Sequence, residues 1–197
     1  MKNKFSEKNI KIKIPAISLF LFLFPLLFER KIFALITLGA ALIHEMGHIF
    51  TASLLRVSVT EITFYPFGAD IKLDSPLRSY KKDILISASG AAANLAAAFF
   101  SLFLPFGELK FFSIASNLVL AVTNLLPIQG LDGGGIVYAF LSQVFSSDTA
   151  EKVLRRLSFG GIFLMWTVSV YIFFVENGNP SLFIIACGLF FTVFLRK

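Results

Sequence analysis

Long apolar runs alternate with short polar segments along the chain, and their lengths predict membrane-spanning helices. A shorter segment, Val57 to Leu73, instead alternates apolar and polar residues on either side of a Pro-Phe-Gly turn, which predicts a β-hairpin after the second run. The pattern therefore predicts an all-α polytopic membrane protein with six transmembrane helices and a small membrane-associated β-hairpin after the second. The six expected spans are about 14–28, 32–55, 83–104, 111–127 with a polar continuation, 158–175 and 181–195.

Composition agrees with this class. Of the 197 residues, 56% are hydrophobic and 15% charged, and the mean hydropathy is +0.80, whereas about 25% of residues are charged in ordinary soluble domains. Spans and short connections use up the length, so we expect one integral membrane domain over residues 1–197, without a soluble regulatory domain. The lone Cys187 excludes an intrachain disulfide.

The net charge of +6 follows the expected topology. With the N-terminus placed in the cytoplasm, 15 of the 18 Lys and Arg residues fall on the cytoplasmic side, and only Arg30, Lys31 and Lys110 fall opposite. The positive-inside rule thus supports a multi-pass protein with both termini cytoplasmic. It also explains the basicity without a nucleic-acid partner.

The second run carries the sequence "HEMGH" in an otherwise apolar context. Residues four apart share one face of a helix, so His44 and His48 can bind one metal ion. Glu45 lies about 100° round the helix, within reach of a water molecule on that ion. The alternative is two histidines hydrogen-bonded within a helix bundle, but ionisable groups inside a membrane are costly and usually functional.

A catalytic zinc usually takes three protein ligands, and the third is expected to be Asp132. This residue lies in the glycine-rich stretch "GLDGGG", where a helix breaks and restarts. In the expected topology the fourth span delivers Asp132 to the cytoplasmic half of the membrane, at the depth of His44 and His48. The alternative is that Asp132 caps the helix starting near Gly134.

These motifs resemble those of the site-2 protease family of intramembrane zinc metalloproteases. The likeness rests on the His-Glu-x-x-His motif, on the stretch from Asn124 to Gly133, and on "ITFYPFGADIKL", and it covers about 32–140. It is strongest to short bacterial members that process sporulation sigma factors, and it implies a bacterial cytoplasmic membrane. The chain departs from the family at two positions that affect backbone stiffness: Leu125 and Ala91 each stand where the family often has Pro.

Further residues are candidates for contacts with the substrate. Asn94 lies in the third span, whose small residues predict close packing against the histidine helix; it could serve the site or only bond between helices. The resemblance favours a substrate or transition-state role for Asn124, with pinning of the broken helix as the alternative. We also expect the hairpin to offer an edge strand to an unwound substrate, or else to be an amphipathic connector. The hairpin candidates are Ile62, Thr63, Phe64, Tyr65, Pro66, Phe67 and Gly68.

The resulting hypothesis is a zinc-dependent intramembrane endopeptidase with one zinc ion per chain. Its substrate would be a membrane-embedded or membrane-associated protein cut near the cytoplasmic face, such as a sigma-factor precursor or an anti-sigma factor. The expected partners are this substrate, the lipid bilayer and regulatory membrane proteins. The alternatives are a non-catalytic regulator that binds membrane segments, and a metal transporter.

Overall fold

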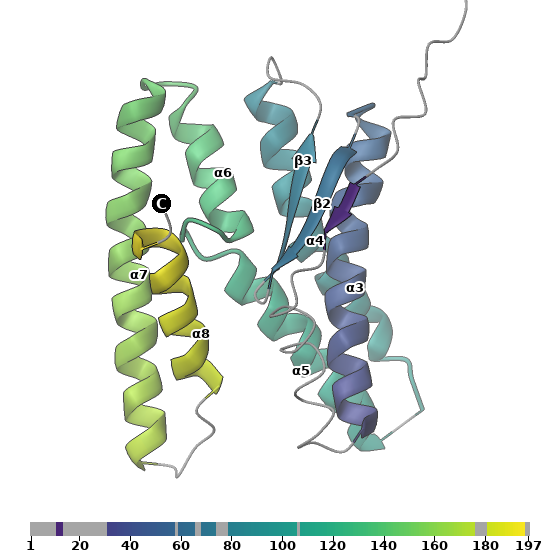
Figure 1. Cartoon of the computed structure of the whole chain (residues 1–197). Coiled ribbons are helices and arrows are strands. Elements are labelled where there is room, and N and C mark those ends of the chain that lie inside the picture. The colour runs from purple at the N-terminus through teal and green to yellow at the C-terminus, as the bar shows by residue number, and fades with distance from the viewer. Residues whose placement is uncertain are drawn as a thin grey trace, which may run out of the picture.

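The computed structural model describes residues 11–13, 31–57, 59–65, 68–73, 79–105, 107–175 and 181–195. The first expected span, about 14–28, and the turn residues Pro66 and Phe67 lie outside the described residues. Figure 1 shows the elements, which are β1 (Lys11–Lys13), α3 (Lys31–Leu54), β2 (Val59–Tyr65), β3 (Gly68–Leu73), α4 (Tyr80–Ser101), α5 (Gly107–Asn124), α6 (Asp132–Leu141), α7 (Ser147–Val175), α8 (Ser181–Phe190) and the π-helix η1 (Phe191–Leu195).

Helices α3 and α4 pack closely because small residues line their contact. A stripe at spacing four, Ala40, His44, His48 and Ala52, is buried along α3. At Gly47 an added Cβ would lie 2.6 Å from the Ser89 carbonyl oxygen of α4, so only a hydrogen fits there. The expected packing of the small-residue span against the histidine helix is confirmed.

The other helices form two groups around this pair. Helix α5 contacts both α3 and α4, and α6 contacts α4 and α7. Helices α7 and α8 pack together on one side of the molecule, and α3, α4 and the strands lie on the other (Figure 1). Helix α6 therefore connects the two sides.

The loop that leads into α6 is anchored on α7 and α8. Ile128 is fully buried in a cluster with Ile162 and Leu189. The backbone N–H of Gln129 donates to Ser158 Oγ at 2.8 Å. Gly130 has a φ of 95°, a left-handed conformation that glycine adopts without strain.

The distribution of side chains is the reverse of that in a soluble protein. The buried apolar residues of the described helices are mostly alanines, such as Ala40, Ala91 and Ala121, whereas large aromatic side chains such as Phe103 and Phe174 are exposed. Membrane helices pack through small residues because lipid competes for large apolar ones. The arrangement is thus suited to a bilayer.

The fold class predicted from the sequence, an all-α protein with six transmembrane helices, is wrong. Among the described residues, three helices are long and apolar enough to cross a membrane: Lys31–Leu54, Tyr80–Ser101 and Ser147–Ile172. Helix α8 has ten residues and η1, which follows it directly, has five, together about 20 Å of helix against a hydrocarbon core of about 30 Å. Helix α5 has 18 residues but begins with Glu108 and Lys110 and contains Asn117, which lowers its hydropathy.

The described strands also differ from a two-stranded hairpin. Strands β2 and β3 pair antiparallel, with Ile62 opposite Ile71. Strand β1 adds to the other side of β2 in parallel, with Ile12 opposite Ile62. The order β1-β2-β3 makes β2 the central strand of a three-stranded sheet, which the sequence pattern did not predict because its third strand comes from the N-terminal segment.

Candidate metal centre

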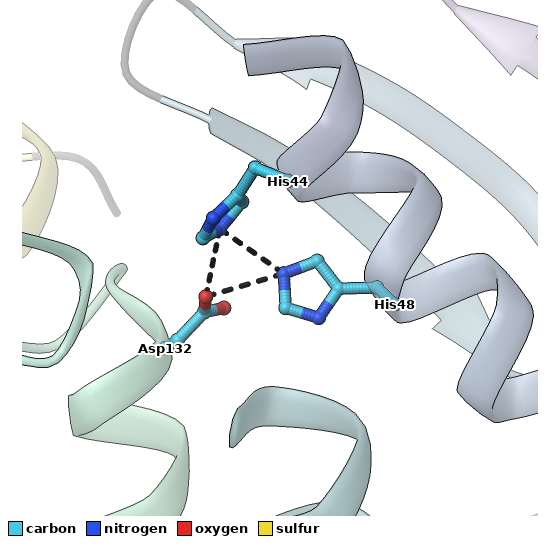
Figure 2. A group of neighbouring side chains, drawn as sticks. All are labelled: His44, His48 and Asp132. Carbon is cyan, nitrogen blue, oxygen red and sulfur yellow. Dashed lines mark hydrogen bonds and ion pairs between the residues drawn. The ribbon is translucent and has the colours of Figure 1, made fainter. Parts of the chain in front are cut away.

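Two histidines and one carboxylate meet between α3 and α6 (Figure 2). Asp132 Oδ2 lies 2.9 Å from His44 Nε2 and 3.2 Å from His48 Nε2. The two Nε2 atoms are 3.2 Å apart. Both imidazole side chains are buried, and that of Asp132 is 21% exposed. Three potential ligand atoms thus converge on one point.

Helix α3 presents both imidazole rings to Asp132 of α6. Their spacing of four residues places them on the buried stripe, with the ring planes nearly perpendicular at 82°. Each Nδ1 atom is hydrogen-bonded away from the cluster: that of His44 to Asn94 Oδ1 at 2.6 Å, and that of His48 to the Ile86 carbonyl at 2.7 Å. These contacts leave both Nε2 atoms facing Asp132.

The third residue is placed by the start of α6. That helix begins at Asp132 itself, and the preceding Leu131 is in the N-cap position. The alternative that Asp132 caps a helix starting near Gly134 does not fit these bounds. Close packing holds the turn, since an added Cβ on Gly133 would collide with the carbonyl oxygens of Leu125 and Leu126.

A glycine of α4 leaves room at the point of convergence. An added Cβ on Gly90 would collide with His48 Nε2 and lie 2.7 Å from His44 Nε2. The space in front of the two nitrogens is therefore kept clear by the absence of a side chain. Two imidazole nitrogens, one carboxylate oxygen and this space fit a zinc ion with an open coordination position.

Glu45 follows His44 in α3 and is half-buried, with its Oε2 atom shielded from solvent. It lies beside the cluster in the sequence and on a neighbouring face of the same helix. A carboxylate in that place is suited to accept and return a proton.

The two asparagines named from the sequence occupy different environments. Asn94 is fully buried against His44. Asn124 is half-buried near the end of α5 and donates from Nδ2 to the Leu120 carbonyl of its own helix at 3.0 Å. Within the described part of the chain, Asn124 makes no hydrogen bond to the three candidate ligands.

The described residues of the candidate edge strand fall on both strands of the hairpin. Ile62 and Thr63 of β2 pair with both β1 and β3, whereas β3 is an outer strand of the described sheet. Gly68 begins β3. The hairpin thus has one outer strand among the described residues, and its pairing with a substrate stays a prediction.

Sequence reasoning missed Asn117 of α5. It is buried, and its Oδ1 accepts from Asn94 Nδ2 at 2.8 Å. The available signal was an amide side chain inside an apolar run, where lipid offers no hydrogen-bond partner. Gly90 was noted only as part of a motif, because its contact with the histidines depends on helix packing.

The fold and the cluster define a helical membrane protein with a candidate metal site between its helices, and comparison with known proteins agrees. The family described as Peptidase family M50 matches residues 32–110 and 106–168. The chain belongs to this family. The resemblance to site-2 proteases stated from the motifs is confirmed.

Individual relatives carry related names. Rip3 of Mycobacterium tuberculosis, named as a zinc metalloprotease, is 32% identical over 119 residues, which are 55% of this chain and 30% of that protein. The zinc metalloprotease MJ0392 of Methanocaldococcus jannaschii is 25% identical over 137 residues, 66% of this chain and 40% of that protein. The chain thus matches less than half the length of these curated relatives.

A solved structure shares the fold. The site-2 protease from Methanocaldococcus jannaschii superposes with a TM-score of 0.69, covering 92% of this chain and 88% of that chain at 20% identity. Membership of the family and the three apolar helices identify the chain as a membrane protein.

Proposed function

We propose that this protein is a zinc-dependent intramembrane endopeptidase. The observation that carries the proposal is the convergence of His44, His48 and Asp132 within 4.8 Å of one another on apolar helices. Membership of a peptidase family and the names of two relatives as zinc metalloproteases support it. The three residues are the proposed ligands of a single zinc ion.

The chemistry assigned to this chain's residues is peptide hydrolysis. Bound zinc would supply a Lewis acid that polarises the scissile carbonyl and lowers the pKa of water. Glu45 accepts the proton of the attacking water and passes it to the leaving amine. Asn124, with its second amide hydrogen available, is the proposed donor to the carbonyl oxygen as charge develops on it.

The charged ends of the helices indicate which side of the membrane the site faces. Basic residues gather where α3 ends and α4 and α7 begin, whereas Lys31 and Lys110 lie near the starts of α3 and α5. In Figure 1 the end of α3 and the starts of α4 and α7 lie at the top of the molecule, and the starts of α3 and α5 lie at the bottom. By the positive-inside rule, we place the basic side in the cytoplasm. His48 lies closer to this end of α3, so cleavage takes place in the cytoplasmic half. The basic residues are Arg56, Lys81, Lys82, Lys152, Arg155 and Arg156.

The proposed substrate is a membrane-embedded or membrane-associated protein segment. A site between apolar helices is reached most directly from the bilayer, and a helical segment must unwind locally before its carbonyls can be attacked. The sigma-factor precursor or anti-sigma factor suggested by the family likeness is the first candidate to test.

The deciding experiment is Glu45→Gln, compared with wild type in membranes of the producing cell. Loss of the base is expected to reduce cleavage by about 100- to 10,000-fold, the usual contribution of general acid–base catalysis, while zinc content stays unchanged. The readout is the membrane proteome, in which the uncut substrate accumulates only with the variant.

The matched control is Glu108→Gln, which removes an exposed carboxylate at the start of α5. It should leave cleavage at the wild-type level. Persistent cleavage by the zinc-loaded Glu45 variant would refute the assigned mechanism. Zinc binding without any substrate that accumulates would instead favour a non-catalytic regulator.

A further inference from the structure

A series of buried amide side chains lies directly behind His44. Asn94 of α4 contacts the His44 ring from the side opposite Asp132, and Asn117 of α5 contacts Asn94. Asn117 in turn donates from Nδ2 to the Ser113 carbonyl at 2.9 Å. We propose that Asn94, held by Asn117, is a positioning residue that fixes His44 in the tautomer with its proton on Nδ1.

The orientation of the Asn94 amide follows from a neighbour that can only accept. Its Nδ2 lies 2.9 Å from the backbone carbonyl of Ala40. A carbonyl oxygen cannot donate, so the amide nitrogen must face it, and Oδ1 must face His44. Since Oδ1 can only accept, the proton in the 2.6 Å contact belongs to His44 Nδ1.

The consequence appears on the other side of the ring. A neutral histidine with its proton on Nδ1 has a lone pair on Nε2. His48 reaches the same state by another means, because its Nδ1 donates to the Ile86 backbone carbonyl. Two lone pairs and the Asp132 carboxylate then converge within 3.2 Å. Electron-rich atoms this close repel one another unless a proton or a metal ion lies between them, so the two tautomers prepare the site for a metal ion.

The same contacts exclude a second role for Asn94. Its Nδ2 has two hydrogens, and both have acceptors: the Ala40 carbonyl and Asn117 Oδ1. The side chain is fully buried. No donor remains for the carbonyl oxygen of a substrate. Of the two asparagines named from the sequence, Asn124 therefore keeps the proposed substrate role, and Asn94 acts through His44.

The two histidines thus differ in how they are held. The partner of His48 is a backbone carbonyl, which a side-chain substitution at position 86 does not remove. The partner of His44 is the Asn94 side chain, which a single substitution removes. Substitution of Asn94 should therefore affect one ligand and leave the other as an internal reference.

This inference rests on the proposed zinc site, and its test reads the ligand instead of proteolysis. The chain has two histidines, so selective ¹⁵N labelling of histidine gives only four ring-nitrogen signals in the zinc-loaded full-length protein. We expect both rings of the wild type to carry a proton on Nδ1 and to bind zinc through Nε2. Zinc affinity is measured on the same samples by competition with a chelating dye.

The informative variants keep or remove the oxygen atom at position 94 that accepts from His44 Nδ1. Asn94→Leu removes it and is expected to weaken zinc binding about 10- to 100-fold, the usual effect of losing a partner of a metal-bound histidine. It should change the His44 signals and leave those of His48 in place. Asn94→Asp keeps an acceptor oxygen toward His44 and should retain the Nδ1 proton, but its second oxygen faces the Ala40 carbonyl and Asn117 Oδ1, so its zinc affinity should stay below that of the wild type. Asn117→Leu removes one of the two acceptors of Asn94 Nδ2 and should weaken zinc binding by a smaller factor than Asn94→Leu.

The possible outcomes separate the two proposals. A wild-type His44 that binds zinc through Nδ1, or an Asn94→Leu protein with wild-type affinity and unchanged His44 signals, overturns this inference alone. Should Asn94→Leu fail to fold, the wild-type signals and the Asn117→Leu affinity decide the matter. Zinc binding with the expected signals but without cleavage overturns the proposed function alone, and a wild type that does not bind zinc overturns both.

Discussion

The two sides of the molecule are built on different principles. Around α3, α4 and α5, polar side chains are buried and joined in a network that runs from His44 through Asn94 to Asn117. On the side of α7 and α8, the contact with the rest of the chain is mainly apolar, with Ile128 enclosed by Ile162 and Leu189. On the first side, hydrogen bonds orient the two histidines. On the second side, apolar packing fixes the loop that precedes Asp132, the third candidate ligand.

This difference shows that a metal centre can be assembled from parts held by unlike forces. Hydrogen bonds fix direction, which the imidazole rings require. Close packing fixes the position of a backbone turn, which is sufficient for a carboxylate at the start of a helix. Substitutions on the two sides should therefore fail in different ways.

The largest effect is expected from Gly90→Ala on the histidine side. The new methyl group would collide with His48 Nε2 and crowd His44 Nε2, so zinc affinity should fall by more than about 100-fold, beyond the usual loss from an outer partner. Dye competition measures the affinity, and circular dichroism verifies the fold.

Gly160→Ala is the matched control in α7, where an added Cβ meets nothing within 4 Å. It should bind zinc as the wild type does and gain up to about 1 kcal/mol of helix stability. Equal zinc affinity of the two variants would show that Gly90 does not guard the site.

An intermediate effect is expected from Ile128→Ala on the packing side. The cavity left by a fully buried isoleucine side chain should lower the free energy of unfolding by about 2–5 kcal/mol. Thermal unfolding in detergent micelles measures the change. Leu164→Ala, which truncates a 64% exposed side chain of α7, should change it by less than about 0.5 kcal/mol; a similar loss in both proteins would argue against the anchoring role.

The smallest effect is expected from Ser158→Ala. The substitution leaves the Gln129 N–H without its acceptor, at a cost of about 1–3 kcal/mol. Zinc affinity should fall only a few-fold because the histidines keep their own partners. Ser169→Ala is the control, since Ser169 Oγ donates only to Trp166 of its own helix; an equal loss of stability in the control would refute the link between α7 and the loop.

The sequence was informative where the chemistry is local. His44, Glu45 and His48 are related by helical spacing alone, and Asp132 stood out as an acid in a glycine-rich break. The sequence predicted only that Asp132 and the histidines lie in the same half of the membrane. The structure places the three side chains together.

Where contacts depend on packing, the sequence was less informative. Asn117 faces Asn94 only because α4 and α5 cross at that level. Strand β1 pairs with a segment 50 positions away, which no local pattern reveals. Among the described residues, hydropathy also predicted more spans than there are helices long enough to cross a membrane, because α8 is apolar but short.

The contact between His44 and Asp132 joins residues 88 positions apart. An ion bound there would cross-link the chain and close a long loop, as a disulfide does in secreted proteins. With Cys187 as its single cysteine, the chain cannot form such a bridge within itself. Because the three side chains lie together only in the folded chain, an ion bound by them would stabilise the folded state, so that loading with metal and resistance to unfolding rise together.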